Sequence, residues 1–247
     1  MEPDEYELMY RVEDRHWWYQ GMASITRLLI ERWVQPDAPL KILDAGCGTG
    51  AAMTTYLAEY GEVTGVDLYP QAMEYSRRRK ARLLARASVL DLPFVPASFD
   101  LVTSFDVLYE RGVRSDATAL REFARVLAPL GRVLLRLPAY DWLRGRHDER
   151  VHTRRRYTAK QLRTLLEQAG FDVEHVSYAN TLLFPLAVLK RLGESLFPLK
   201  ENASDLTLDT GMFNTLFRTI LSSEAPLIAK FGLPFGLSVV AVGRKRS

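Results

Sequence analysis

A glycine-rich run is the first part of the sequence whose residue types and spacing suggest a ligand. It reads DAGCGTG over residues 44–50 and lies between a short apolar segment and a helix-like one. Glycines at alternate positions let the main chain approach a ligand closely and take positive φ values. The free N–H groups at the start of the next helix suit an anionic group such as a carboxylate. The D-x-G-x-G-x-G spacing differs from the G-x-G-x-x-G of dinucleotide-binding folds.

Two aspartates stand where the next two strands of such a fold would end. Asp67 follows the glycine run by about 20 residues, and a carboxylate there accepts hydrogen bonds from both hydroxyls of a ribose. Because an NAD-binding protein uses the same device, Asp67 alone does not discriminate between the two classes. Asp91 lies in the segment SVLDLPF over residues 88–94, where the structural alternative is a solvated turn.

Taken together, these segments resemble the motifs of class I S-adenosylmethionine-dependent methyltransferases, closest to the type 11/12 group. The resemblance covers roughly residues 40–180 and implies S-adenosylmethionine as the cofactor, with no metal ion. It implies that Asp91 accepts from the adenine amine and that Leu92 meets the adenine ring. The cofactor-binding residues that it implies are Asp44, Gly46, Cys47, Gly48, Gly50, Asp67, Leu68, Asp91, Leu92 and Phe105.

Two histidines follow the fifth predicted strand and are candidates for a general base. His147 and His152 lie beside carboxylates in a segment that should leave the sheet near the acceptor. An imidazole with a pKa near 6.5 takes up a proton readily at neutral pH. A base is needed only when the acceptor is protonated, as a hydroxyl or ammonium group is. The alternative is that both histidines are solvated or cap a helix.

The same region is basic, with seven basic against three acidic side chains over residues 141–160. Its densest part is the run of three arginines at 154–156. Such a run beside a small-molecule site is able to hold a phosphate or carboxylate of the acceptor. A salt-bridged, solvated surface is the alternative.

An aromatic pair precedes the core, in the run HWW over residues 16–18. It resembles a pair found in some relatives, where the helix that carries it covers the cofactor. In those relatives a basic residue often follows, whereas this chain has Gly21 and Met22, so no cofactor contact is assigned there. Packing of the tryptophans on the sheet is an equal alternative.

Composition excludes several classes of protein. The chain has 247 residues, 47% of them hydrophobic, and a formal net charge of +3, which is too small to indicate a nucleic-acid partner. The single cysteine excludes an internal disulfide. No Asn-Pro-Pro-Tyr-type motif for a flipped base is present. We expect a cytoplasmic protein without a membrane span, and peripheral membrane association stays open.

Apolar strands alternate with amphipathic helices from residue 40 onwards, a pattern typical of a parallel sheet with helices on both faces. Residues 5–34 are predicted as helical. The predicted strands are Lys41–Ala45, Glu62–Asp67, Arg82–Ala87, Leu101–Phe105, Arg132–Leu137, Asp172–Tyr178 and Leu237–Gly243. The fold class is α/β, a doubly wound, mostly parallel seven-stranded sheet. We divide the chain into an N-terminal helical cap (1–39), a Rossmann-like core (40–180), a helical insertion or lid (181–233) and the final strand (234–247).

The insertion separates the last two strands, which should pair directly. Long insertions in compact domains are usually functional, and this one is apolar at helical spacing, as at Leu216, Phe217, Ile220 and Leu221. We predict a helical roof over the acceptor pocket whose apolar inner surface is continuous with the donor cavity. Burial in the core, a dimer interface and a lipid surface are the alternatives.

These observations predict methyl transfer to a small-molecule acceptor, by O- or N-methylation of a bulky, partly apolar metabolite with or without an anionic part. One alternative is a lipid or quinone-like acceptor at a membrane surface. Another is a non-catalytic interaction protein that binds the donor. No nucleic-acid partner is expected, and both a monomer and a homodimer are compatible with the sequence.

Overall fold

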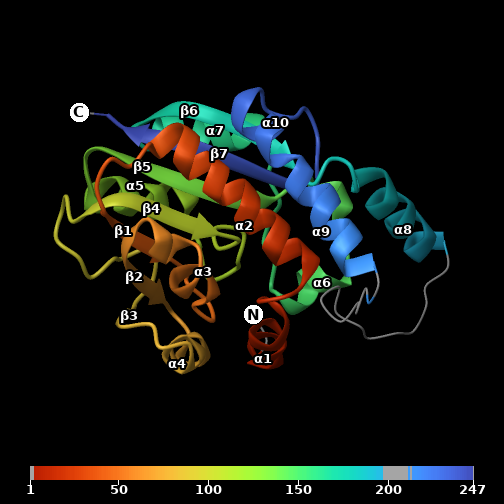
Figure 1. The fold of residues 1–247 in the computed structure, drawn as a ribbon, viewed down its shortest axis with the longest axis horizontal. Coiled ribbons are helices and arrows are strands. Elements are labelled where there is room, and N and C mark those ends of the chain that lie inside the picture. Colours follow the sequence, from red (N-terminus) through yellow and green to blue (C-terminus); the bar gives the residue numbers. More distant parts are fainter. Residues whose placement is uncertain (1–2, 197–210, 212, 247) are drawn as a thin grey trace.

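A seven-stranded sheet forms the centre of the molecule (Figure 1). The computed structural model describes residues 3–196, 211 and 213–246. The strand order is β3-β2-β1-β4-β5-β7-β6, with β7 antiparallel to both of its neighbours and the other pairs parallel. The strands are β1 (Leu40–Ala45), β2 (Gly61–Asp67), β3 (Leu83–Arg86), β4 (Phe99–Phe105), β5 (Leu127–Pro138), β6 (Phe171–Ala179) and β7 (Ser238–Lys245). The predicted fold class is confirmed, including the direct pairing of the last two strands.

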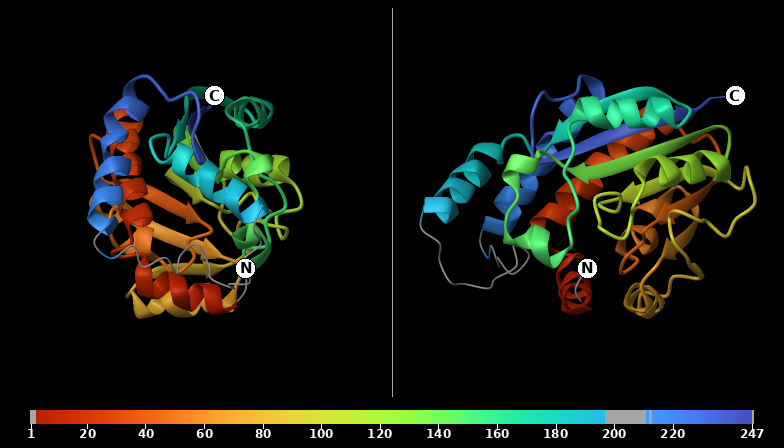
Figure 2. Two further views of the ribbon diagram at one scale, coloured as in Figure 1. Left: turned by 90° about the vertical axis from the view of Figure 1, so that its right-hand side faces the viewer. Right: turned by 180° about the vertical axis from the view of Figure 1, so that it is seen from behind.

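Helices cover both faces of the sheet, as the alternating pattern predicts (Figures 1 and 2). One layer contains α2, α9 and α10, which lie side by side, and the opposite face carries α5 and α7. The helices that pack on the sheet or follow the glycine loop are α2 (Trp17–Leu29), α3 (Ala51–Thr54), α4 (Pro70–Arg78), α5 (Asp116–Val126), α7 (Ala159–Gln168), α9 (Phe213–Ser223) and α10 (Ala225–Lys230). Those beyond the carboxyl edge of the strands are α1 (Pro3–Val12), α6 (Arg146–Arg150) and α8 (Phe184–Leu196).

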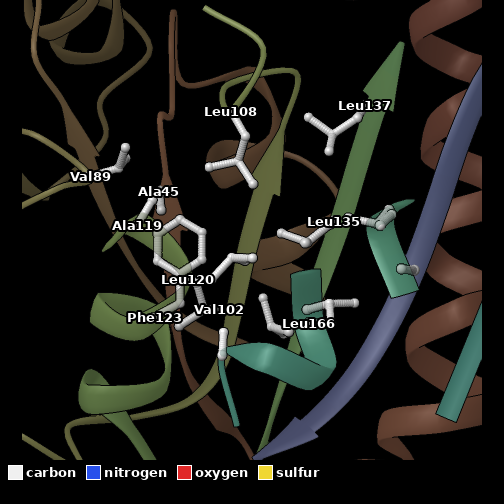
Figure 3. Close-up of a cluster of buried hydrophobic side chains, with 14 of the residues drawn as sticks. Ala45, Val89, Val102, Leu108, Ala119, Leu120, Phe123, Leu135, Leu137 and Leu166 are labelled. Atoms are coloured by element: carbon white, nitrogen blue, oxygen red, sulfur yellow. The ribbon is translucent and has the colours of Figure 1, made fainter. Parts of the chain in front are cut away.

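The hydrophobic core under α5 is formed by side chains that recur at helical spacing (Figure 3). Leu120 and Phe123 of α5 are fully buried against Val102 of β4 and Leu135 of β5. Leu166 of α7 is buried in the same cluster. Full burial of a side chain of this kind contributes about 1.5–3 kcal/mol. This layer holds β4 and β5 rigid, and their carboxyl ends face the site described below.

Two predicted helices are interrupted. The segment 5–34 divides into α1 and α2, because the turn between them is stabilised by His16, whose Nδ1 accepts a hydrogen bond from the Trp18 N–H at 3.3 Å. The helix-like segment that follows the glycine run ends as α3 after four residues. There Thr54 and Thr55 donate their hydroxyls to carbonyls four residues back, a pattern that often bends helices.

The second half of the insertion packs as part of the core. Leu221 of α9 and Ile228 of α10 are fully buried against α2. Helices α2 and α9 approach so closely that a Cβ added at Gly21 would lie 2.6 Å from Leu221. Residues 197–210 and 212 of the predicted lid lie outside the described residues.

This close approach gives a prediction for Gly21→Ala. Alanine favours a helix over glycine by about 1 kcal/mol, but overpacking against a buried side chain costs about 1–3 kcal/mol. We expect the free energy of unfolding to fall by about 1–2 kcal/mol in urea denaturation. Combined with Leu221→Ala, which removes the clash, the two changes should cost less than the sum of the single variants. Strict additivity would contradict the close packing of α2 on α9.

Candidate functional site

A single cavity of about 700 Å³ opens at the carboxyl ends of the parallel strands. The loop residues Gly46 and Gly48 line it from β1, and Asp67 lines it from the end of β2. Its walls continue to Leu183 at the start of the insertion and to Phe217 of α9. The helices around this edge are α1, α6, α8 and α9 (Figure 2, left). The structure thus brings the glycine loop and the insertion to the same cavity.

The glycine loop takes a path that side chains would obstruct. Gly46, Gly48 and Gly50 have φ values of 87°, 56° and 80°. A Cβ on Gly46 would lie 2.2 Å from Val107, so glycine is required both by the backbone and by the contact. The Gly48 N–H donates to Asp67 Oδ2 at 3.0 Å, and the Tyr69 N–H donates to Asp67 Oδ1 at 3.0 Å.

Asp67 therefore both holds the loop and faces the cavity. Each carboxylate oxygen accepts one backbone N–H, and each has a further lone pair for a ligand donor. Burial raises the pKa of Asp67, while the two backbone N–H groups lower it. The side chain is 8% exposed, so a hydrogen bond from a ligand would be made in a largely dehydrated place.

Asp44 stands below the loop and does not line the cavity. It is 2% exposed and accepts a hydrogen bond from the Thr103 hydroxyl at 2.9 Å. Burial raises the pKa of Asp44 to about 7, although the Thr103 hydroxyl acts in the opposite direction. Asp44 thus supports the loop from within the sheet.

The N-terminal helix closes over the glycine loop. Glu13, just after α1, is 5% exposed and accepts the hydroxyl of Thr49 in the loop. Arg79 donates to Glu13 at 3.0 Å and to Asp14 at 2.8 Å, which joins this segment to the end of α4. Tyr6 and Met9 of α1 line the cavity. Tertiary contacts of α1 thus make the first residues of the chain one wall of the site.

A buried arginine lies beside the loop, and sequence reasoning missed it. Arg136 of β5 is 7% exposed, lines the cavity and pairs through Nε with Asp106 at 2.7 Å. Its guanidinium carbon lies 4.7 Å from the ring centroid of Trp18 and 4.8 Å from that of Phe105. No described residue accepts a hydrogen bond from its two terminal nitrogens. The signal in the sequence was an arginine inside an otherwise apolar strand, where a charge needs a specific partner.

The other predicted cofactor residues divide into two groups. Leu68 and Phe105 line the cavity. Cys47 is buried beneath the loop, where a Cβ on Gly65 would lie 2.9 Å from its sulfur, and Gly50 begins α3 against Ser76. Cys47 and Gly50 therefore shape the loop and do not border the cavity.

The structure does not bring Asp91 and Leu92 to the cavity. Asp91 is exposed, and Leu92 is buried in the core with its N–H bound to Glu122 at 2.8 Å. After β3 ends at Arg86, the chain meets the cavity at once. Ser88 and Val89 line the cavity instead, and a tight turn from Ser88 to Asp91 then leads the chain away.

Of the two predicted histidine bases, His152 does not line the cavity. Val151 and Thr153 line the cavity, whereas His152 between them, with a left-handed backbone φ of 55°, does not. The side chain of His147 lies outside the described residues. Among the described side chains, His16 is the histidine that lines the cavity.

Internal carboxylates neutralise the basic run. Arg154 and Arg155 both pair with Asp116 at the start of α5, which is 4% exposed. Arg156 binds Asp148 through two parallel contacts of 2.8 and 2.9 Å. Although burial opposes the charged form, the bond from Arg156 helps to lower the pKa of Asp148. The three arginines therefore fasten the segment to the core, and the predicted anion site at 154–156 is not formed.

Within the described ranges, no group of three or more histidine, cysteine or acidic side chains is arranged to hold a metal ion. Among residues 3–196 and 213–246, no helix combines the length and the apolar character needed to cross a membrane.

Comparison with known proteins agrees with this geometry. Residues 43–135 match a family described as a methyltransferase domain. A demethylmenaquinone methyltransferase of Clavibacter sepedonicus is 36% identical over 120 residues, which cover 47% of this chain and 48% of that protein. An O-methyltransferase of Penicillium expansum is 31% identical over 150 residues, covering 55% and 53% respectively. The chain thus spans about half the length of the curated relatives that it matches.

Through this match over residues 43–135 and through its fold, the chain is similar to the class I S-adenosylmethionine-dependent methyltransferases of the type 11 group. An S-adenosylmethionine-dependent methyltransferase from Thermotoga maritima has the same fold, with a TM-score of 0.60 and 18% sequence identity. That likeness covers 98% of this chain and 96% of the other. S-adenosylmethionine is the cofactor of this family, and the loop, the lone pairs of Asp67 and the cavity volume fit it.

The pKa of Asp44 gives a prediction for stability against pH. A carboxyl whose pKa rises from 3.8 to about 7 on folding stabilises the protein below pH 3.8, and that contribution is lost as the pH rises to 7. Asp44→Asn, which stays neutral, should be more stable than the unaltered protein by about 2–4 kcal/mol at pH 8 without ligand. Denaturation between pH 4 and 8 measures this. Asp100→Asn, at an exposed position of β4, is the control. If the free energies of unfolding of Asp44→Asn and of the unaltered protein changed with pH in parallel, the raised pKa of Asp44 would be contradicted.

Proposed function

We propose that the protein transfers the methyl group of S-adenosylmethionine to a small-molecule acceptor. The observation that carries this proposal is the single cavity shared by the glycine loop, Asp67 and the insertion. Donor and acceptor held in one enclosure react as neighbours, and alignment of this kind is worth up to about 7–11 kcal/mol of the barrier. S-adenosylmethionine supplies the methyl group on a good leaving group, so the protein's task is to align the partners and exclude water.

In this proposal Asp67 holds the ribose of the donor, and the main chain of the glycine loop lies against the donor beside it. Leu68, Ser88 and Val89 border the adenine, with Ser88 and Val89 taking the place first given to Asp91 and Leu92. Asp44, Cys47 and Gly50 act indirectly, by supporting the loop.

Arg136 and Asp106 suit the amino-acid end of the donor. Both line the cavity, carry opposite charges and are joined through one guanidinium nitrogen only. The terminal nitrogens of Arg136 are then able to bind the carboxylate of the donor, and Asp106 is able to accept from its ammonium group. This pair supplies the cation that Gly21 and Met22 do not provide.

The cap side of the cavity favours a bulky, apolar acceptor. Leu183, Leu186 and Ala187 of the insertion and Phe217 of α9 border it. His16 faces the same space, but its Nδ1 already accepts the Trp18 N–H, so the neutral ring carries its proton on Nε2. We therefore assign His16 the role of a hydrogen-bond donor to the acceptor, and we assign no residue as the general base.

A quinone-like or lipid acceptor at a membrane surface is the second candidate. Leu182 just before α8, and Leu186 and Leu189 on α8, are 58%, 56% and 66% exposed, and α8 borders the cavity. Quinone methyltransferases are among the relatives. These leucines would place the mouth of the cavity against an apolar phase.

Binding of S-adenosylhomocysteine to Asp67→Ala tests the donor site. We expect micromolar-range affinity for the unaltered protein, little affinity for NAD, and a loss of about 1.5–3 kcal/mol in the variant, the range for a hydrogen bond to a charged group. Isothermal titration calorimetry measures both. Asp91→Ala is the matched control and should bind as tightly as the unaltered protein. Equal losses in the two variants would return the adenine contact to Asp91.

Comparison of two nucleosides tests Arg136. Methylthioadenosine has the adenosine and the sulfur of S-adenosylhomocysteine but lacks its carboxylate and ammonium groups. Arg136→Lys keeps the charge and loses the two-pronged geometry, so affinity for S-adenosylhomocysteine should fall about 10-fold or more, with methylthioadenosine unchanged. Arg132→Lys, on the same strand and paired with Glu174 at 2.8 Å, is the control. Equal weakening of both nucleosides would show a structural role only.

A further inference from the structure

Asn180 is a buried polar residue with an unfilled hydrogen-bonding group at the base of the cavity. It directly follows β6, where the core passes into the insertion, and it is 1% exposed. It lines the cavity. Its side-chain oxygen Oδ1 has no hydrogen-bond partner among the described residues. Buried amide oxygens are nearly always bonded, so this one calls for a partner that enters the cavity.

The wall around Asn180 lies where β5, β6 and β7 meet, and it is mostly apolar, with Ser238 as a second polar side chain that lines the cavity. Pro138 of β5 pairs with Ser238 of β7, which in turn pairs with Ala179. Pro138, Leu237 and Leu183 line the cavity there. Within this wall the amide of Asn180 is a polar point that fixes the orientation of an otherwise apolar ligand, as in most small-molecule sites.

Each arginine that lines the cavity has a contact within the protein. Arg156 donates to both carboxylate oxygens of Asp148, and Arg136 is paired with Asp106. The guanidinium of Arg191 lies against Gly145, where an added Cβ would meet its Nη1 at 2.0 Å. A charged acceptor would lose its hydration on entering this mostly apolar part of the cavity and would find no side chain among the described residues set aside to pair with it, which is energetically costly.

We propose that the cap side of the cavity binds an apolar acceptor through a neutral hydroxyl group, which donates its hydrogen bond to Asn180 Oδ1. This inference rests on the proposed methyl transfer and narrows its acceptor class to neutral, hydroxyl-bearing apolar molecules. Asn180 acts as the residue that selects and orients this hydroxyl. His16 also lines the cavity, and its buried Nε2, which has no partner among the described residues, is available to donate to another oxygen of the same molecule.

A conformational role for Asn180 is the alternative, and it sets the choice of variant. The backbone of Asn180 is left-handed, with φ at 62°, and asparagine is one of the few residues that adopt this conformation readily. Asn180→Gly keeps that conformation and removes the amide. Gln35→Gly is the matched control, because Gln35 also has a positive φ, of 50°, and is not among the cavity residues.

Titration of three naphthalene probes, with and without S-adenosylhomocysteine, tests the inference. The probes are 1-naphthol, 1-methoxynaphthalene and 1-naphthoate, which share a ring and present a neutral donor, no donor and an anion. We expect 1-naphthol to bind about 3- to 10-fold more tightly than 1-methoxynaphthalene, and 1-naphthoate most weakly. Asn180→Gly should abolish the preference for the hydroxyl, and Gln35→Gly should retain it.

The possible results separate this inference from the proposed function. An unchanged preference in Asn180→Gly, no preference in the unaltered protein, or tightest binding of 1-naphthoate would each overturn the role of Asn180. Failure of S-adenosylhomocysteine to bind would reject the donor site, and the titrations without it would still decide the role of Asn180.

Discussion

The hydrogen bond from the Gly48 N–H to Asp67 joins the end of β1 to the end of β2, and the rest of the site depends on it. The loop between β1 and α3 has left-handed backbone at three glycines, and several of its N–H groups bond to β2, those of Gly46 and Cys47 to the Val66 carbonyl and that of Gly48 to Asp67. Asp67 satisfies one of them and stays at the cavity wall. From below, the Thr103 hydroxyl holds Asp44 in place. A ligand-binding surface made of main chain is thereby kept open by two buried carboxylates that cost stability in the ligand-free protein.

Compensation of buried charge organises the walls around this loop. Arg79 connects the segment after α1 to α4, and Arg150 of α6 binds Asp4 at 2.8 Å and also Glu5. The run 154–156 is bonded to Asp116 and Asp148. Leaving one partner of such a pair unmatched in a dehydrated place is strongly unfavourable, so these contacts specify where each segment docks. The basic run at 154–156, which the sequence suggested as an anion-binding surface, instead forms salt bridges that hold the cavity walls together.

The insertion combines two of the roles that its composition allowed. Its second half, α9 and α10, packs on α2 as an extension of the core, and Asn214 of α9 bonds both sides of the turn before α2, at the Trp17 N–H and the Arg15 carbonyl. Its first half, α8, borders the cavity with apolar side chains. Because α9 is hydrogen-bonded to the turn that carries His16, this half of the insertion is joined to the N-terminal wall of the cavity.

Local patterns determined the strands, the glycine loop and Asp67, because strand-helix alternation, glycine spacing and the acid after β2 are set by neighbouring residues. The pairing of β6 with β7 was expected from the fold class and is confirmed, whereas the order of the strands came from the structure. Only the tertiary structure decided which residues face the ligand. Ser88 and Val89 line the cavity in the place first given to Asp91 and Leu92, and His152 does not line it. Arg136 and Asn180 were recognised as site residues from their burial. The sequence shows an arginine within a strand and an asparagine after one, but only the structure shows that each is buried with hydrogen-bonding atoms that the described residues around it leave unpaired.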